Sequence, residues 1–598
     1  TRMKDTTDRP LRKLPFTLGA LRAAYQGGAR PRDVIAEMYA RLDDIDDPGI
    51  FIHLVAREEL LAAAEALGPY DAARPIWGIP FAVKDNIDVA GLPTTAACPA
   101  WRYTAERDAF VVARLRAAGA IPVGKTNLDQ FATGLVGMRS PYPPPRNALD
   151  PAIVPGGSSS GSAVVVGHGA LPFALGTDTA GSGRVPAALN GIVGLKPSLG
   201  LLSATGVVPA CRTLDTVSVF AASVADAHAV LQEAAAFDAT DGFARPAPAP
   251  ALPAPLPRPR IAVPDAASLI TFGDAAQADA FAATVAAFKA EGARVTAVDL
   301  TPFYRVAEML YDGPWVAERF AAVEDLITRS PEALHPVTRA IVERARDFSA
   351  TDAFRGFYRL ADLRRACEQV LAAHDMLCVP TIPTFYSVDD LAADPVGPNS
   401  RLGTYTNFVN LLDLCALAFP TGPRRDGRPG SVTLIGPAGT DGMLAAQAMR
   451  FRDEDASETV APASGEIALA VCGAHMSGLP LNTALTSRGA RFLRTTRTAP
   501  GYRLVELPGG PPARPGLMRG AGDAAIALEV WAMPRATIGD LLAEIPAPLG
   551  LGRIALEDGA EVTGFLCEAA GTTDARDITH LGGWRAYLAQ HEGDSARP

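Results

Sequence analysis

Residues 155–198 read PGGSSSGSAVVVGHGALPFALGTDTAGSGRVPAALNGIVGLKPS and place two clusters of serine and glycine around one apolar run. No lysine, arginine, aspartate or glutamate occurs between Pro155 and Asp178, and Lys84 lies upstream in FAVKDN. A serine hydroxyl becomes a good nucleophile only when a base removes its proton, and a lysine is such a base only when desolvation keeps it neutral. Glycine-rich backbone beside a nucleophile offers N–H groups to an oxyanion. The segment therefore favours serine–lysine hydrolase chemistry, although each cluster alone could be a turn and Lys84 a solvated strand end.

The composition around this segment is that of a globular protein. The 598 residues are 48% hydrophobic and 20% charged, enough for three or four ordinary units or for one large enzyme domain plus a smaller one. The net charge of −10 makes general nucleic-acid binding an unfavourable interpretation. Seven dispersed cysteines form neither a disulfide framework nor a metal-binding spacing. We expect a cytoplasmic protein without signal peptide, membrane span, metal or organic cofactor.

Two motifs match well-known sequence patterns but lack the neighbouring elements that each pattern requires. GAIPVGKT (119–126) fits the phosphate-binding loop, but such a loop must follow a strand and open a helix. Here a helical pattern precedes Gly119 and the variable positions resemble the strand itself. GSSSG (157–161) fits a nucleophile elbow centred on Ser159, which would need a downstream acid and histidine. We interpret both as local structure.

The periodicity along the chain indicates an α/β architecture around a mixed sheet. Residues 17–47 and 52–67 are helical in pattern, and 78–90 read as a strand. AFVVARLRAAGAIPVGKTN (109–127) reads as a helix, a terminating glycine and a short strand. Alternating helices and strands are typical of α/β folds.

Two linkers divide the chain. The Pro/Ala-rich stretch 244–260 is predicted to be an extended, solvent-exposed connection. The acidic stretch 452–466 precedes a β-rich pattern. The predicted domains are 1–457 and 467–598, joined by a linker at 458–466.

Residues from about 20 to 450 resemble the amidase signature family. The motifs GGSSSGS and GTD-x-x-GS are both present, and 24 positions separate Ser158 from Ser182 as the family requires. The resemblance implies a Ser–cis-Ser–Lys triad in which Lys84 is the base, Ser158 the relay and Ser182 the nucleophile. It also implies an oxyanion hole built from the backbone N–H groups of Thr179, Ala180, Gly181 and Ser182. Ala180 departs from the glycine of many relatives, but a backbone donor survives that change.

Within this family, three strings resemble the allophanate hydrolases: DQFATGLVGMRSPY (129–142), TAGSGRVPAALNG (179–191) and LYDGPWVAERF (310–320). The resemblance implies that Tyr311 and Arg319 hold a substrate carboxylate, and a planar guanidinium suits that role. If the segment is one helix, eight residues place the two side chains on one face, about 80° apart. The alternative is that Arg319 is an ordinary surface residue of a helix.

The stretch 467–598 resembles the additional domain of allophanate hydrolases, with a sheet-rich pattern similar to the γ-glutamylcyclotransferase-like fold. VCGAHMSGLPLN (471–482) is its best-matching part, and it makes His475 a candidate for promoting decarboxylation of the first product. Glu529 is a weaker candidate, and His580 has no argument of its own. A structural histidine, or a domain that serves only assembly, is the alternative.

The resemblance as a whole implies hydrolysis of allophanate to ammonia and carbon dioxide, after a biotin-dependent urea carboxylase has made allophanate. It further implies a homodimer. The acidic net charge and the short apolar runs predict that the chain binds neither nucleic acid nor membrane. The alternatives are a general small-amide amidase and the ammonia-generating A-type component of a tRNA-dependent amidotransferase.

Overall fold

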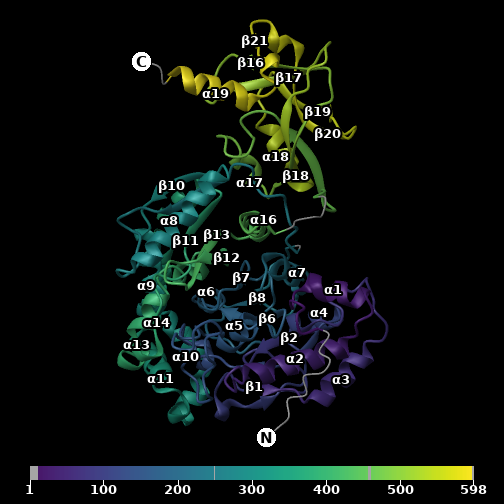
Figure 1. Cartoon of the computed structure of the whole chain (residues 1–598). Helices are drawn as coiled ribbons and strands as arrows, with labels where there is room; N and C mark the ends of the chain where they lie inside the picture. Colours follow the sequence, from purple (N-terminus) through teal and green to yellow (C-terminus); the bar gives the residue numbers. More distant parts are fainter. Residues whose placement is uncertain (1–10, 248, 455–459, 596–598) are drawn as a thin grey trace. The chain divides into compact units, whose positions relative to one another are not determined.

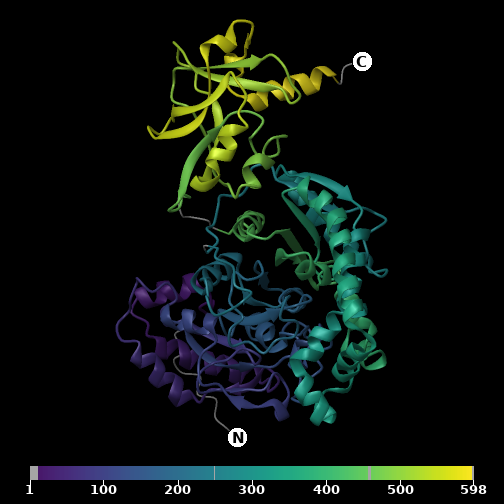
Figure 2. The same ribbon diagram turned by 180° about the vertical axis from the view of Figure 1, so that it is seen from behind.

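The chain folds into two compact units (Figure 1, Figure 2). The structure is a computed structural model that describes residues 11–247, 249–454 and 460–595. The large unit comprises Thr1–Pro250, Ile261–Glu291 and Val295–Asp455, and the small unit comprises Ala251–Arg260, Gly292–Arg294 and Ala456–Pro598. The predicted domain end at residue 457 lies outside the described residues.

The large unit is built on a mixed sheet with eleven strands in its described part. In sheet order the strands are β1 (Phe51–Leu54), β5 (Ile121–Thr126), β2 (Pro80–Lys84), β6 (Phe173–Asp178), β8 (Thr216–Ala221), β7 (Val193–Lys196), β12 (Leu414–Pro423), β13 (Pro429–Pro437), β11 (Met376–Pro380), β9 (Arg260–Pro264) and β10 (Arg294–Val298). β2 runs parallel to β5 and β6, and β11 runs parallel to β9. The strands from β6 to β11 pair antiparallel with one another. The predicted α/β fold with a mixed central sheet is confirmed.

Helices flank this sheet (Figure 1, Figure 2). Their bounds are α1 (Leu18–Gln26), α2 (Pro31–Ile45), α3 (Arg57–Ala66), α4 (Phe110–Ala117), α5 (Ser160–Gly167), α6 (Val185–Leu189), α7 (Val224–Ala234), α8 (Ala275–Ala290), α9 (Thr301–Asp312), α10 (Trp315–Arg329), α11 (Pro336–Glu343), α12 (Ala350–Ala372), α13 (Val388–Ala393), α14 (Gly397–Leu402), α15 (Asn407–Leu411) and α16 (Asp441–Phe451). The short hairpin of β3 (Pro93–Thr94) and β4 (Tyr103–Thr104) lies outside the main sheet.

The helical prediction for 17–47 and 52–67 is only partly right. The first stretch forms two helices, because Gly27 and Gly28 interrupt it before Pro31 starts the second helix. The second stretch opens with strand β1, whose residues FIHL pair with β5. Aromatic and β-branched side chains favour a strand, and pairing with a neighbour decides the outcome here.

Two buried strands set up the interior of the large unit. Every residue of β2 and β6 is buried, as expected for strands with neighbours on both sides and helices over the sheet. The register pairs Val83 with Leu175, so the ends of β2 and β6 lie side by side. Lys84 and Asp178 are the polar residues at these two ends. Helix α5 begins at Ser160, within the first serine cluster.

The small unit combines two sheets in its described part. The larger has the order β15 (Arg491–Arg497), β18 (Ala527–Pro534), β14 (Glu466–Val471), β20 (Glu561–Cys567) and β19 (Leu549–Ala555). The smaller has the order β17 (Arg514–Arg519), β16 (Tyr502–Leu507) and β21 (Arg576–Asp577). Its helices are α17 (Thr483–Thr486), α18 (Ile538–Ala543) and α19 (Trp584–Ser595). The predicted β-rich α+β character of this part is confirmed.

The Pro/Ala-rich stretch 244–260 is not solvent-exposed throughout. Its second half, Ala251–Arg260, belongs to the small unit. Leu256 is buried, and the Ala254 N–H donates to the Phe492 carbonyl at 3.0 Å. The predicted exposure is therefore wrong for this half. Proline removes a backbone donor but leaves the carbonyl groups and an apolar ring, both of which can pack against a neighbouring strand.

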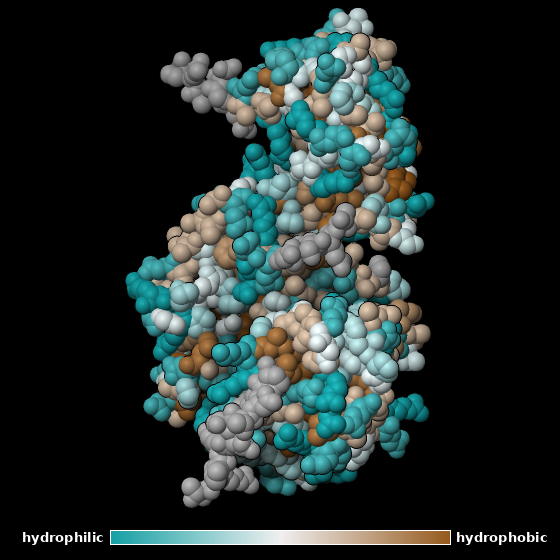
Figure 3. Space-filling view, turned by 45° about the vertical axis from the view of Figure 1, so that its right-hand side comes forward, coloured by the Kyte–Doolittle hydropathy of each residue, from teal (hydrophilic) through white to brown (hydrophobic). Residues whose placement is uncertain are grey.

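Hydrophilic and hydrophobic residues are interspersed on the face drawn in Figure 3. Across the described ranges, no helix combines the length and apolar character needed to cross a membrane. The same residues contain no group of three or more histidine, cysteine, aspartate or glutamate side chains placed to hold a metal ion.

Candidate active site

Lys84 and Ser158 form the centre of a buried hydrogen-bonded group in the large unit. Lys84 ends β2 and is 0% exposed. Its Nζ donates to the hydroxyl oxygens of Ser158 and Thr177, each at 2.7 Å. Ser158 is also buried and follows a cis peptide bond from Gly157. The structure thus brings together two of the three residues predicted to form the triad.

The environment of Lys84 favours its neutral form. Burial lowers the pKa of Lys84 from 10.5 to about 7, although the carboxylates of Asp129, Asp215 and Asp178 act in the opposite direction. Both hydrogen-bond partners of the Lys84 Nζ are hydroxyl groups, and Lys84 forms no ion pair among the described residues. A lysine with a pKa near 7 has a substantial neutral fraction at neutral pH, and the neutral form can accept a proton, as a general base must.

Ser182 lies on the loop between β6 and α6. It is 2% exposed, and its hydroxyl donates to the carbonyl of Gly134 at 3.5 Å, the outer limit for a hydrogen bond. No hydrogen bond joins Ser182 to Ser158 in the described part of the chain. Catalytic hydrogen bonds are often long before substrate binds, so the relay from Ser158 to Ser182 stays a prediction.

The Ser182 loop is held by an ion pair that the sequence analysis did not identify. Both oxygens of Asp178 accept from Arg184 at 2.9 Å, and both residues are fully buried. The same carboxylate accepts the backbone N–H groups of Gly181 and Gly183, each at 3.0 Å. Buried charges need partners of this kind, and a bidentate pair also fixes geometry. Asp178 and Arg184 thus position Ser182, which lies between the two glycines.

These contacts also bear on the predicted oxyanion hole. The N–H of Gly181 points to Asp178 and is already engaged. The N–H groups of Thr179, Ala180 and Ser182 have no hydrogen-bond acceptor among the described residues, which leaves them for an oxyanion. Gly181 has a φ of +125°, and a Cβ there would lie 2.3 Å from the Thr406 hydroxyl, so glycine is required at this position.

Tyr311 and Arg319 meet, but they do not share a helix. Tyr311 lies at the end of α9 and Arg319 in α10, with Gly313 and Pro314 between the two helices. The condition of a single helix is therefore not met, because the Gly–Pro pair ends the first helix. The side chains still come together: Arg319 Nη2 donates to the Tyr311 hydroxyl at 3.4 Å, and the guanidinium lies 5.1 Å from the centre of the Tyr311 ring.

Arg319 is a buried cation that forms no ion pair within the described residues. Its side chain is 2% exposed and no carboxylate of the described residues forms an ion pair with it. Nη1 donates to the Thr133 hydroxyl at 3.0 Å, and the buried Nε has no acceptor within the described chain. Guanidinium groups stay charged in proteins, so this side chain has charge and donors left for an anion.

Thr133 and Gly134 connect Arg319, the predicted carboxylate-binding residue, to the predicted nucleophile, Ser182. Thr133 binds Arg319, and the next residue, Gly134, accepts from Ser182. Thr133 lies within the string 129–142, but nothing in the sequence marks it as a site residue. A threonine beside a glycine is too common a pair to signal a site without its partners in space.

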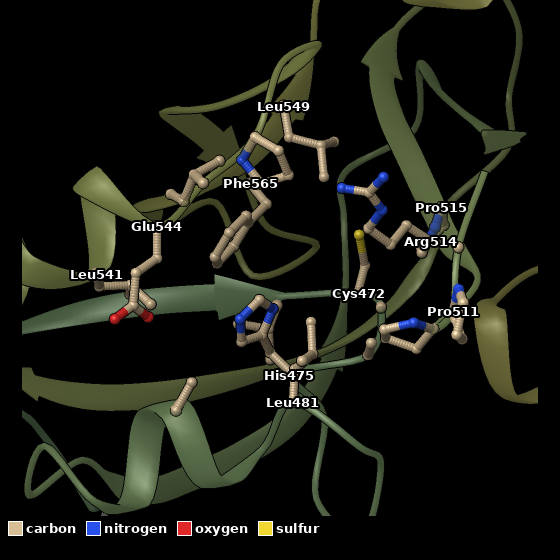
Figure 4. A pocket seen from close by; sticks show the side chains of 18 residues that line it. Cys472, His475, Leu481, Pro511, Arg514, Pro515, Leu541, Glu544, Leu549 and Phe565 are labelled. Carbon is tan, nitrogen blue, oxygen red and sulfur yellow. The ribbon is translucent and has the colours of Figure 1, made fainter. Parts of the chain in front are cut away.

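His475 lies in a separate pocket of about 360 Å³ within the small unit (Figure 4). Its ring stacks on Phe565, with 4.8 Å between ring centres. Burial, together with Arg488, lowers the pKa of His475 from 6.5 to about 4, so the ring is neutral at pH 7. The other two candidates of this part lie elsewhere. Glu529 is buried and paired with Arg585 at 2.7 Å, and His580 is exposed.

The family of the chain follows from comparison with known proteins. The profile of the amidase family, described as "Amidase", matches residues 33–445, well over half of the chain. The chain belongs to the amidase family. A second profile, described as "Allophanate hydrolase C-terminal domain", matches residues 467–589. The predicted resemblance is confirmed for both parts.

Individual relatives agree with this amidase assignment. The chain is 42% identical to urea amidolyase of Saccharomyces cerevisiae over 90% of its own length and 31% of the relative. The structure of Kluyveromyces lactis allophanate hydrolase has 39% identity and a TM-score of 0.77, covering 97% of this chain and 100% of that one. The A-type component of the glutamyl-tRNA(Gln) amidotransferase of Nitratidesulfovibrio vulgaris is 34% identical over 70% of this chain and 93% of the relative. The chain spans about a third of the length of the urea amidolyases it matches.

Within the amidase domain, the two misleading motifs are local structure, as predicted. Residues 121–126 of GAIPVGKT form strand β5, and Lys125 is paired with Asp85 at 3.1 Å in the interior. Ser159 of GSSSG occupies the N-cap position of α5, and its hydroxyl donates to the Thr177 carbonyl at 3.2 Å. Neither residue is free to bind a phosphate or to attack a substrate.

Proposed function

We propose that this amidase hydrolyses allophanate with Ser182 as the nucleophile, Ser158 as the relay and Lys84 as the base. The observation that supports this substrate is the buried, unpaired guanidinium of Arg319, linked to Ser182 through the consecutive residues Thr133 and Gly134. Allophanate has a carbamoyl group to hydrolyse and a carboxylate to hold. A planar guanidinium binds such a carboxylate through two parallel hydrogen bonds.

The proposed reaction assigns one role to each of these groups. Neutral Lys84 accepts the proton of Ser158 while Ser158 accepts that of Ser182, whose oxygen attacks the carbamoyl carbon. The N–H groups of Thr179, Ala180 and Ser182 stabilise the resulting oxyanion. The bond between the carbonyl carbon and the terminal NH₂ group breaks, the returning proton leaves with that nitrogen as ammonia, and Ser182 retains the ⁻O₂C–NH–CO– acyl group. Water then releases the dicarboxylated amine and restores Ser182.

Ammonia release separates this proposal from its alternatives. Purified protein is given allophanate, urea, malonamide, glutamine and a fatty amide in parallel. We expect allophanate to be the preferred substrate by kcat/KM. Preference for glutamine would favour the A-type amidotransferase component, to which the chain is also similar. Preference for a neutral amide would favour a general amidase and would contradict the proposed role of Arg319.

The first prediction concerns binding of the substrate carboxylate by Arg319. Arg319→Ala is expected to lower kcat/KM for allophanate about 10- to 150-fold, because a charge-assisted bidentate contact contributes about 1.5–3 kcal/mol. Turnover of malonamide, which has no carboxylate, should fall much less. The measurement is kcat/KM for both substrates with each variant.

A matched control lies on the same helix. Arg329 is exposed and donates to the Asp325 carbonyl, so Arg329→Ala should leave both substrates unaffected. Equal losses on allophanate and malonamide in Arg319→Ala would mean that Arg319 supports the packing of Tyr311 and Thr133 and does not recognise a carboxylate.

The second prediction concerns the C-terminal domain, which we propose promotes decarboxylation of the dicarboxylated amine through His475. His475→Ala in the full chain should release the first ammonia at the parent rate, because Lys84, Ser158 and Ser182 are unchanged. Carbon dioxide release should slow to the spontaneous rate. The full chain is needed, since deleting the domain would remove the packing partners of Ala251–Arg260.

Ammonia and carbon dioxide are followed together on one sample. His580→Ala is the matched control, since His580 is a histidine of the same unit that is exposed and outside the pocket. Carbon dioxide release as fast in His475→Ala as in the parent would contradict a second active site at His475.

The proposed partners follow from the substrate. Allophanate is a carboxylated urea, so a biotin-dependent urea carboxylase is the proposed supplier, and relatives named urea amidolyase agree with this link. A cytoplasmic homodimer stays a prediction, which light scattering of the purified protein and cell fractionation would test.

A further inference from the structure

The pocket that contains His475 is also lined by a cation, Arg514, that forms no ion pair with any described residue. Arg514 begins β17 and is half-buried on the pocket wall. Across the described residues it has neither a carboxylate partner nor a hydrogen-bond acceptor. Other arginines of this unit do have such partners: Arg488 pairs with Glu544, Arg491 with Glu466, Arg494 with Asp558, Arg503 with Asp577 and Arg585 with Glu529. Arg514 therefore keeps its full donor capacity for a ligand.

The remaining wall offers few other groups to an anion. Most of the lining is apolar, and Pro511, Pro512 and Pro515 have no backbone N–H to donate. The lining carboxylate, Glu544, is already neutralised by Arg488. The pocket with its paired groups thus has a net charge of +1 at neutral pH, which comes from Arg514. A small anion entering this cavity would be bound mainly by that guanidinium.

Figure 4 shows the His475 ring and the Arg514 side chain extending into the same pocket from different walls. The ring nitrogens of His475 have no hydrogen-bond partner in the described part of the chain. The ring stacks on Phe565, and Asn482 holds the backbone of this residue by donating to the His475 carbonyl at 2.8 Å. A ligand held by Arg514 would therefore meet a positioned imidazole whose nitrogens are unused.

We propose that Arg514 binds one carboxylate of a small dicarboxylate in this pocket and holds the molecule against His475. The identity of that ligand as the dicarboxylated amine rests on the proposed function. A cavity of about 360 Å³ is large enough for such a molecule, and a guanidinium is the side chain best suited to its carboxylate.

The chemistry of the proposed step balances with one proton. In the reaction ⁻O₂C–NH–CO₂⁻ + H⁺ → CO₂ + H₂N–CO₂⁻, a carbon–nitrogen bond breaks and its electron pair stays on nitrogen, where the proton binds. Two negative charges next to His475 favour the protonated imidazole, because an opposite charge within a few ångströms stabilises the charged form. Binding of the dicarboxylate would thus supply the proton donor that the empty pocket lacks.

Malonate is the probe, since it replaces the central NH by CH₂. The full chain contains eight histidines, so selective labelling of histidine rings gives few NMR signals, and His475→Gln assigns the one of interest. We expect malonate to shift the His475 signal in a saturable way and acetate or malonamide to have little effect. Arg514→Gln should weaken malonate binding about 10- to 150-fold at this signal.

Two further variants complete the experiment. Arg519 lies on the same strand and donates to the Arg553 carbonyl, so Arg519→Gln should bind malonate like the parent. Arg514→Lys keeps the charge but not the planar guanidinium, so its affinity for malonate should lie between those of the parent and Arg514→Gln. If thermal unfolding shows that Arg514→Gln is misfolded, Arg514→Lys takes its place in the comparison. Equal malonate affinity in Arg514→Gln and the parent would overturn the proposal, as would an unchanged His475 signal in the parent. Neither outcome depends on allophanate turnover, so a failure of the proposed function is recognised separately, by the ammonia assay.

Discussion

Replacing Ser182 by alanine is expected to lower kcat for ammonia release from allophanate about 10⁴-fold or more, because the covalent intermediate can no longer form. Stability should hardly change. The Ser182 hydroxyl makes one hydrogen bond, to Gly134, at the outer distance limit of 3.5 Å. Its loss therefore removes little favourable energy from the folded state, since even a good hydrogen bond contributes only about 0.5–1.5 kcal/mol. The measurements are kcat by ammonia release and Tm by calorimetry.

Ser162→Ala is the matched control and should show the opposite pattern. Ser162 is a buried serine of the first cluster, but its hydroxyl donates to the Leu175 carbonyl at 2.9 Å and lies 2.7 Å from that of Thr126. Its removal should lower Tm more than Ser182→Ala does, with most of the activity retained. Even a tenth of the parent kcat in Ser182→Ala would mean that another group is the nucleophile.

The second large effect is expected at Lys84. Lys84→Ala and Lys84→Arg should both lose about 10³-fold or more in kcat/KM, because general-base catalysis contributes about 10²–10⁴-fold and arginine cannot give up its proton. In the parent, kcat/KM should fall about tenfold for each pH unit below about pH 7. The sign follows from burial: the pKa of Lys84 is lowered to about 7, the neutral form is the active one, and acid converts it to the inactive cation. Malonamide should show the same acidic limb, because it does not itself titrate in this range.

Lys196 separates base chemistry from the general cost of removing a buried lysine. It is also fully buried, with a pKa lowered to about 8 by burial, but its Nζ donates only to the carbonyls of Pro197 and Leu414 in the described structure. Lys196→Met should lower Tm and keep the acidic limb of the pH profile. Substantial activity in Lys84→Arg, or a parent profile that stays flat from pH 8 to pH 5.5, would contradict proton abstraction by Lys84.

Much of the amidase domain could be predicted from its sequence because one motif is both long and specific. The two serine and glycine clusters, with Lys84 upstream, point to a Ser–Lys centre before any fold is known, and Lys84 and Ser158 indeed lie 2.7 Å apart. Spacing does not reveal the groups that hold this centre. Asp178 and Arg184 belong to the motif itself, but only the folded loop shows that their ion pair fixes the glycines beside Ser182.

The expectations that the structure did not meet have a common physical cause. A local sequence pattern does not show which distant residues will contact it in the folded chain. Tyr311 and Arg319 would share one helical face only in a continuous helix, but the Gly313–Pro314 pair divides the segment, and the side chains meet across the break. The stretch 244–260 looked like an exposed linker from its composition. Its second half instead packs on residues that lie about 220–240 positions later in the chain.

That long separation fixes an order of events during synthesis. Residues 251–260 leave the ribosome early, whereas Ser477, whose hydroxyl donates to the Arg258 carbonyl, follows 219 residues later. By then the last helix of the amidase domain, which ends at Phe451, has already been made. The large unit can therefore fold on the nascent chain before the partners of Leu256 and its neighbours have been made, and the small unit can be completed only after the residues beyond 466 have been synthesised. A gene fragment that begins at residue 467 would encode the small unit without this early segment.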